Sequence, residues 1–272
     1  MFKWRQELRR KGWWALALVA LLLWVCNPAP CQSNVQVRFE LQSTSVTAHE
    51  PVYLILSVHN GLEESITLGP APFEDSFFNF SVLPPDGSVV RLPPVVHGGL
   101  QQVAPVEVAP GKTYTTKHIL NDRYQFNLAG NYVLDVSLGG GVRTRSGASI
   151  ASPPESLTLS VTPRDPKRLQ EVCQGLAEAA AGFGKFSTLS EAAVTLGYVE
   201  DPVAIPYLGK VLAYNNLVSG LAVDGLVRIG GPEALKVLTS NLDTSNSALR
   251  DQIQLGINVI KSGRKPGIQG VD

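Results

Sequence analysis

Cysteine and histidine are scarce in this chain of 272 residues, which contains 3 Cys and 4 His. The four histidines, His49, His59, His97 and His118, are far apart in the sequence, so no cluster has the ligand spacing of a zinc site. The sequence also lacks a Gly-x-Ser-x-Gly elbow, a His-Glu-x-x-His helix and a phosphate-binding glycine loop. We therefore predict no metal, no cofactor and no catalytic residues, and a protein that is not an enzyme. The enzyme alternative requires carboxylates or histidines from distant segments to meet in a cleft.

An excess of charge is absent as well, with 23 basic and 23 acidic residues. The first eleven residues hold five of the basic residues and one acidic residue, so the rest of the chain has 18 basic and 22 acidic residues. That remainder carries a net charge of about −4 and no basic patch that could neutralise phosphates. The charge balance therefore argues against nucleic acid as a partner, and we predict none.

The basic N-terminus precedes an uncharged run at 13–25, WWALALVALLLWV. A positive segment, a short apolar run and a small-residue exit are the layout of a secretory signal peptide, whereas a membrane span needs about 20 apolar residues. Ala29 and Cys31 place the predicted cleavage after residue 31. We expect a secreted or periplasmic protein that is not inserted in the membrane after signal removal. The alternative is a membrane tether through an uncleaved or lipid-modified N-terminal segment.

Residues 35–163 alternate between apolar and polar side chains, and turn residues interrupt the alternation. VQVRFELQ at 35–42 and PVYLILSVHN at 51–60 show the period of two that is typical of half-buried strands. Further strands are predicted within 76–83, 106–120, 130–138 and 155–161. Seven or more short strands with no helical period between them predict an antiparallel β-sandwich.

The stretch AGNYVLDV, which follows APGKTYTTKHIL, resembles the late strands of immunoglobulin-like or fibronectin-like domains of exported bacterial proteins. In such domains a Gly-x-Tyr opens a strand, and the residues here are Gly130 and Tyr132. The resemblance implies that Tyr132 packs across the end of the sandwich. It implies a fold and no function.

Residues 165–261 change to helical spacing and repeat about every thirty residues. A shift of thirty places Pro202 on Pro232 and Leu208 on Leu238. The copies AVTLGYVEDPVAIPYLGKVL and VDGLVRIGGPEALKVLTSNL resemble HEAT-like repeats, which implies stacked helix pairs. Asp201 is expected to cap a helix whose first turn holds Pro202, and Pro206 is expected to remove one hydrogen bond inside that helix.

The predicted fold class is thus multidomain all-β plus all-α, with an immunoglobulin-like antiparallel β-sandwich followed by a short HEAT-like α-helical repeat stack. The predicted organisation is a signal peptide at 1–31, the sandwich at 35–163, the helical repeats at 165–261 and a disordered tail at 262–272. The only cysteine left after cleavage, Cys173, lies among apolar residues at helical spacing and is expected in the helical core.

Three segments carry candidate interaction residues because they combine aromatic and polar side chains. PFEDSFFNF at 72–80 has more phenylalanines than one buried face needs, PPVVHGGLQQVAP at 93–105 is a long loop, and NDRYQFN at 121–127 mixes both types. For the last segment the structural interpretation is a crossing between sheets with Tyr124 and Phe126 packed inward, and a recognition surface is the alternative. The candidate surface consists of Phe73, Phe77, His97, Tyr124 and Phe126.

From these features we predict an exported, non-enzymatic scaffold or adaptor. It binds a protein partner of unknown identity through the sandwich loops and the helical-repeat surface. The alternative is a peptidase inhibitor that acts through the loop at 93–105.

Overall fold

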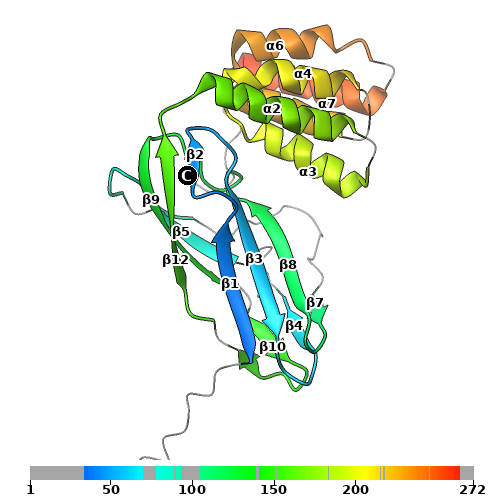
Figure 1. Cartoon of the computed structure of the whole chain (residues 1–272). Helices are drawn as coiled ribbons and strands as arrows, with labels where there is room; N and C mark the ends of the chain where they lie inside the picture. The colour runs from blue at the N-terminus through cyan, green and yellow to red at the C-terminus, as the bar shows by residue number, and fades with distance from the viewer. Residues whose placement is uncertain are drawn as a thin grey trace, which may run out of the picture.

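The computed structural model describes residues 34–69, 78–88, 90–92, 105–138, 141–150, 152–182, 184–214, 216, 218–244 and 246–263. The last strand ends at Thr162 and the first described helix begins at Pro166 (Figure 1). The predicted signal peptide, the tail after Gly263 and the candidates Phe73, Phe77 and His97 lie outside the described residues.

The described strands form three sheets of three, four and five strands, in the orders β1-β3-β8, β11-β10-β4-β7 and β2-β12-β9-β5-β6. The pairings are antiparallel except for β2 with β12, which run parallel. The strands are β1 (Val35–Leu41), β2 (Ser45–Thr47), β3 (Tyr53–Asn60), β4 (Ile66–Leu68), β5 (Phe78–Leu83), β6 (Val90–Arg91), β7 (Val106–Val108), β8 (Thr113–Ile119), β9 (Gly130–Leu138), β10 (Val142–Thr144), β11 (Ser149–Ile150) and β12 (Glu155–Thr162).

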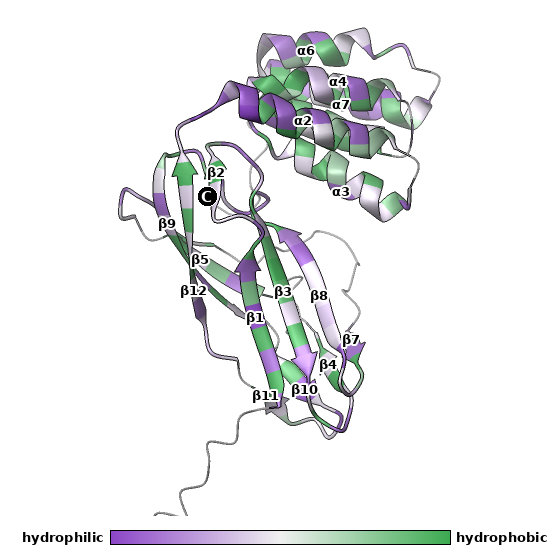
Figure 2. Ribbon diagram, viewed as in Figure 1, coloured by the Kyte–Doolittle hydropathy of each residue, from purple (hydrophilic) through white to green (hydrophobic). Residues whose placement is uncertain are grey.

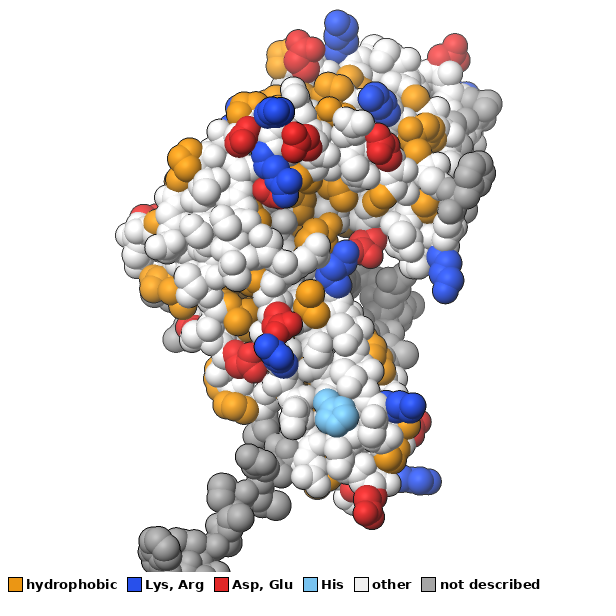
Figure 3. Space-filling view, viewed as in Figure 1, with side chains coloured by type: hydrophobic (Ala, Val, Ile, Leu, Met, Phe, Trp, Pro, Cys, Tyr) orange, Lys and Arg blue, Asp and Glu red, His pale blue; other side chains and the backbone are white. Residues whose placement is uncertain are grey.

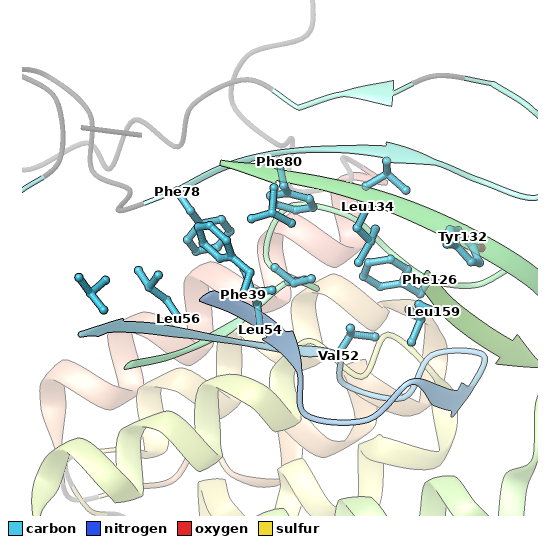
Figure 4. Close-up of a cluster of buried hydrophobic side chains, with 14 of the residues drawn as sticks. Phe39, Val52, Leu54, Leu56, Phe78, Phe80, Phe126, Tyr132, Leu134 and Leu159 are labelled. Carbon is cyan, nitrogen blue, oxygen red and sulfur yellow. The ribbon is translucent and has the colours of Figure 1, made fainter. Parts of the chain in front are cut away.

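The alternation read from the sequence sets which side chains enter the core of the strand region. In β3, Leu54, Leu56 and Val58 are fully buried, and the residues between them are only partly buried. The same alternation of apolar and polar residues runs along β1 (Figure 2). Side chains of β1 and β3 face those of β5, β9 and β12, so this part of the core lies between the three-stranded and the five-stranded sheets (Figure 4).

Gly130 and Tyr132 explain the Gly-x-Tyr motif at the start of β9. Gly130 has φ of 140°, and a Cβ there would lie 2.6 Å from the side chain of Pro85, so both backbone conformation and space require glycine. Tyr132 is fully buried, and its hydroxyl donates to the carbonyl of Leu128 at 2.9 Å and accepts the N–H of Leu128 at 3.1 Å. The tyrosine therefore closes the loop that leads into β9.

The helical region packs around a second buried core that is separate from the first. Consecutive helices pack in pairs, α2 on α3, α4 on α5 and α6 on α7, and the pairs contact one another (Figure 1). The elements are α2 (Pro166–Ala181), α3 (Phe186–Gly197), the 3₁₀ turn η1 (Pro202–Ala204), α4 (Ile205–Ala213), α5 (Ser219–Ile229), α6 (Gly231–Ser240) and α7 (Ser247–Ser262).

The two prolines of DPVAIPYL stand in the first turns of two separate helical elements. The carboxylate of Asp201 accepts the N–H of Val203 and caps η1, whose first residue is Pro202. The α-helix α4 starts only at Ile205, so Pro206 stands in its first turn. The expected loss of a hydrogen bond inside a helix at Pro206 is therefore wrong, because a first-turn N–H has no partner within the helix.

The predicted fold class, an all-β immunoglobulin-like antiparallel sandwich followed by an all-α HEAT-like stack, is also wrong. The strands form three small sheets, and the β2–β12 pair is parallel. Helix and strand hold 38% and 30% of the described residues, so the chain has mixed helix and strand content. Side-chain period identifies strands and helices, but it does not fix which strands pair, how many sheets they form or how helices stack.

Candidate functional site

The link between the strands and α2 is fixed by hydrogen bonds to one threonine of β2. The Thr47 hydroxyl donates to the carbonyl of Pro163 and accepts the N–H of Asp165, both at 2.8 Å. The carboxylate of Asp165 then accepts the N–H groups of Lys167 and Arg168 and caps α2. The first turn of α2 is thereby held against the strand region.

A second contact joins this link to η1. The Arg164 guanidinium donates from Nε and Nη2 to the two carboxylate oxygens of Asp201, at 2.5 and 2.9 Å. Burial acts to raise the pKa of Asp201, but the bonds from Arg164 and from the N–H of Val203 outweigh it and hold that pKa below its usual value. Asp201 is only 2% exposed, so its charge depends on this partner.

Glu50 forms the third contact, between the loop before β3 and α2. Its Oε1 accepts bonds from Nε and Nη2 of Arg168, at 3.2 and 2.9 Å. Its Oε2 accepts the N–H of Thr47 at 3.0 Å. The bonds to Glu50 raise the pKa of Arg168 above its usual value. Both oxygens of this buried carboxylate therefore accept hydrogen bonds within the protein.

Tyr53 and Lys117 contact α3 from the strand region. The Tyr53 hydroxyl donates to Thr195 Oγ1 at 3.1 Å, and burial raises the pKa of this tyrosine. The Lys117 ammonium lies 2.7 Å from Glu191 Oε1 and 4.4 Å from the centre of the Tyr53 ring. Helices α2 and α3 and the turn η1 are thus each tied to the strand region or to the link by polar side chains.

A groove of about 220 Å³ opens between the strand region and α2, and we call it the junction groove. Apolar side chains line part of it, and on α2 Val172 and Leu176 stand one helical turn apart. Figure 3 shows hydrophobic side chains gathered in the hollow between the two regions, with charged side chains around it. The residues that line the groove are Gln42, Ser43, Val46, Glu50, Pro51, Val52, Tyr53, Arg168, Val172 and Leu176.

Two reactive side-chain types lie in environments that suppress their chemistry. Cys173, on α2, is fully buried, and burial raises the pKa of its thiol to about 12. Burial and the nearby Arg123 lower the pKa of His118 to about 4, so its imidazole is neutral at pH 7. In the residues that the structure describes, no three His, Cys, Asp or Glu side chains form a group that could hold a metal ion.

The structure places the two described sequence candidates away from the junction groove. Phe126 is fully buried and packs its ring 5.4 Å from that of Tyr132, so it belongs to the core and cannot form part of an exposed surface. Tyr124 is half-buried, with its ring 5.1 Å from that of Phe126. The inward packing that the structural interpretation of 121–127 predicts describes both residues. The candidate loop at 93–105 lies outside the described residues up to residue 104.

Sequence reasoning missed the groove residues because they come from segments more than a hundred residues apart. Glu50 and Arg168 meet across 118 positions, and neither stands in a recognisable motif. The available signal was local: Val172 and Leu176 are apolar but lie beside the buried stripe of α2, which holds Leu169 and Cys173. Such a second apolar stripe indicates a further contact surface.

Comparison with known proteins assigns no family. No protein family matches the chain, and no curated protein matches it. Among solved structures, the structural-genomics target SoR45 has 12% identity and a TM-score of 0.32. The match covers 49% of this chain and 90% of the SoR45 chain.

Two further solved structures are similarly distant. The sporulation control protein Spo0M from Bacillus subtilis has 11% identity and a TM-score of 0.27 over 53% of this chain and 54% of its own. The alkylpurine DNA glycosylase AlkC from Pseudomonas fluorescens has 9% identity and a TM-score of 0.26. That match covers 49% of this chain and 32% of the glycosylase chain. Likeness at this level carries no argument about function. Within the described ranges, no helix is both long and apolar enough to cross a membrane.

Proposed function

We propose that this chain is a non-enzymatic protein-interaction module that acts outside the cytoplasm, and that its partner places an extended segment in the junction groove. The proposed location rests on the signal-like N-terminus of the sequence. The observation that carries the binding proposal is a groove, lined in part by apolar side chains, between regions that polar side chains hold together.

The chemistry of the groove favours an occupant with apolar side chains. Its two charged lining residues, Glu50 and Arg168, already neutralise each other, so a charged ligand side chain would have to break that pair. Val172 and Leu176 are about 6 Å apart along α2, because four residues rise about 1.5 Å each. Alternate side chains of an extended peptide are spaced by roughly 6.6 Å, which matches this distance.

The fixed junction supports binding because a groove that exists before the partner arrives does not have to be ordered on binding. Ordering an interface side chain costs about 0.5–1.5 kcal/mol. The contacts of Arg164, Arg168, Tyr53 and Lys117 have already fixed the two walls. A partner segment therefore meets a surface of constant shape.

Photo-cross-linking tests the proposal. A cross-linking amino acid at Gln42, which is exposed on the rim of the groove, is compared with one at Leu255, a residue of α7 that is 64% exposed. We expect a discrete cross-linked partner in the extracytoplasmic fraction from position 42 and not from position 255. Leu176→Asp in the position-42 protein should abolish that product while the fold is retained. Identical products from both positions, or a product that survives Leu176→Asp, would contradict the proposal.

A further inference from the structure

In two edge strands, a glutamate side chain accepts a hydrogen bond from a backbone N–H that would otherwise face outward. In β1, which is an edge strand, the N–H of Phe39 donates to Glu155 Oε2 at 3.1 Å. In β2, also an edge strand, the N–H of Thr47 donates to Glu50 Oε2 at 3.0 Å. Bonds of this kind stop another strand from pairing at those positions.

The edge of β8 is built differently. In the β3–β8 pair, the N–H of Asn60 donates to the carbonyl of Lys112, and the N–H of Leu120 donates to the carbonyl of Val52. Because hydrogen-bonded pairs alternate along an antiparallel ladder, the even-numbered residues of β8 bond to β3. The odd-numbered residues direct their N–H and C=O groups away from the sheet, and these are Thr113, Thr115, Lys117 and Ile119.

No other described strand pairs with this outward row. Across the described residues, no backbone hydrogen bond connects it to another element, and β8 ends the order of its sheet. The side chains of Thr113, Thr115 and Lys117 are exposed. β8 is seven residues long, which is the length of an ordinary strand and enough to template another strand.

We propose that this edge pairs with β8 of a second copy of the chain, antiparallel and centred on Thr115. In that register Thr115 faces Thr115 of the second copy, and Lys117 faces Thr113. Lys117 is the one charged residue of the outward row, so no like charges oppose each other, and facing threonines stabilise a strand pair. A shift that centred the pair on Lys117 would instead place two ammonium groups together.

The position of the helices favours the antiparallel arrangement. Lys117 lies near the C-terminal end of β8 and bonds to Glu191 on α3, so the helical region lies beyond that end (Figure 1). Parallel copies would bring two helical regions to the same end. Antiparallel copies separate them and join the two three-stranded sheets into one sheet of six strands with twofold symmetry.

Two substitutions at the centre of the edge test the pairing. Thr115→Pro removes an N–H that points away from β3, so the sheet within one copy keeps its bonds. Thr115→Val is the matched control, because it also removes the hydroxyl that contacts Ser57 but keeps the N–H. The mass of each purified protein is measured by light scattering after size exclusion, and thermal unfolding confirms that each is folded.

We expect the wild type and Thr115→Val to have twice the mass of Thr115→Pro at the same concentration. In the two dimeric proteins, hydrogen exchange at the amides of the outward row should slow as concentration rises. A monomeric wild type, including one whose β8 edge binds a different protein, overturns the proposal. A Thr115→Pro dimer overturns it as well, since the copies would then meet elsewhere. Because no partner protein is present, the result is independent of the junction groove.

Discussion

The strand region and the helical region fill their cores with different side chains. Among the described residues, the strand core buries large rings such as Phe39, Phe126 and Tyr132, whereas the buried helical core contains no aromatic residue and relies on Leu, Val and Ala. Small residues let helices approach closely: a Cβ on Gly225 would lie 2.7 Å from the Cα of Gly197. The strand region is therefore sensitive to lost volume, and the helical region to added volume.

The largest expected effect is in the strand core. Phe126→Ala removes a fully buried ring and leaves a cavity, so we expect a loss of about 3–5 kcal/mol in the free energy of unfolding. Denaturant unfolding followed by tyrosine fluorescence measures it. A loss of less than 1 kcal/mol would show that Phe126 is not part of the core, and would restore 121–127 as a recognition segment.

The helical core should respond to a single added methyl group. Gly225→Ala forces a Cβ against the backbone of Gly197 and the side chain of Leu208, so we expect destabilisation of about 1–3 kcal/mol. Gly175→Ala is the control, because a Cβ there meets nothing within 4 Å, and helix propensity should stabilise it by about 0.5–1 kcal/mol. If both substitutions changed the free energy of unfolding in the same direction, the helical core would not be sensitive to added volume in the way proposed here.

The contact between Arg164 and Asp201 should give the smallest change in stability and a dependence on pH. Arg164 is partly exposed, so we expect Asp201→Asn to cost roughly 1–2 kcal/mol at pH 7. The folded-state pKa of Asp201 is depressed, so this stabilisation is present above the unfolded pKa of about 4 and disappears as pH falls through the folded-state pKa. Unfolding curves of both proteins from pH 7 to pH 2 check this, and a difference that stays constant to pH 2 contradicts it.

The sequence predicts elements better than it predicts their assembly. The period of two places strands at Val35–Leu41, Tyr53–Asn60 and Gly130–Leu138, and Asp201 caps the helical turn that begins at Pro202, as predicted. The number of sheets and the parallel β2–β12 pair escape prediction, because pairing depends on contacts between strands distant in sequence.

The candidate site escaped prediction for the same reason. Arg168 reads as an ordinary exposed residue of a helix, and Glu50 as a loop carboxylate. Each acquires its role only when β2, β3 and α2 come together. The aromatic residues of 121–127 led the sequence analysis to place interaction residues there, but the rings of Tyr124 and Phe126 pack against the core.

The relative position of the two regions tests the account most directly. Spin labels are attached to cysteines that replace Thr158 on β12 and Lys236 on α6, both exposed, in a chain whose Cys26 and Cys31 are serine. Cys173 is buried and should not react with the label. Pulsed electron resonance should give one narrow distance distribution, which broadens when Arg164 and Arg168 are both replaced by alanine. A broad distance distribution in the protein that keeps Arg164 and Arg168 would contradict a preformed groove.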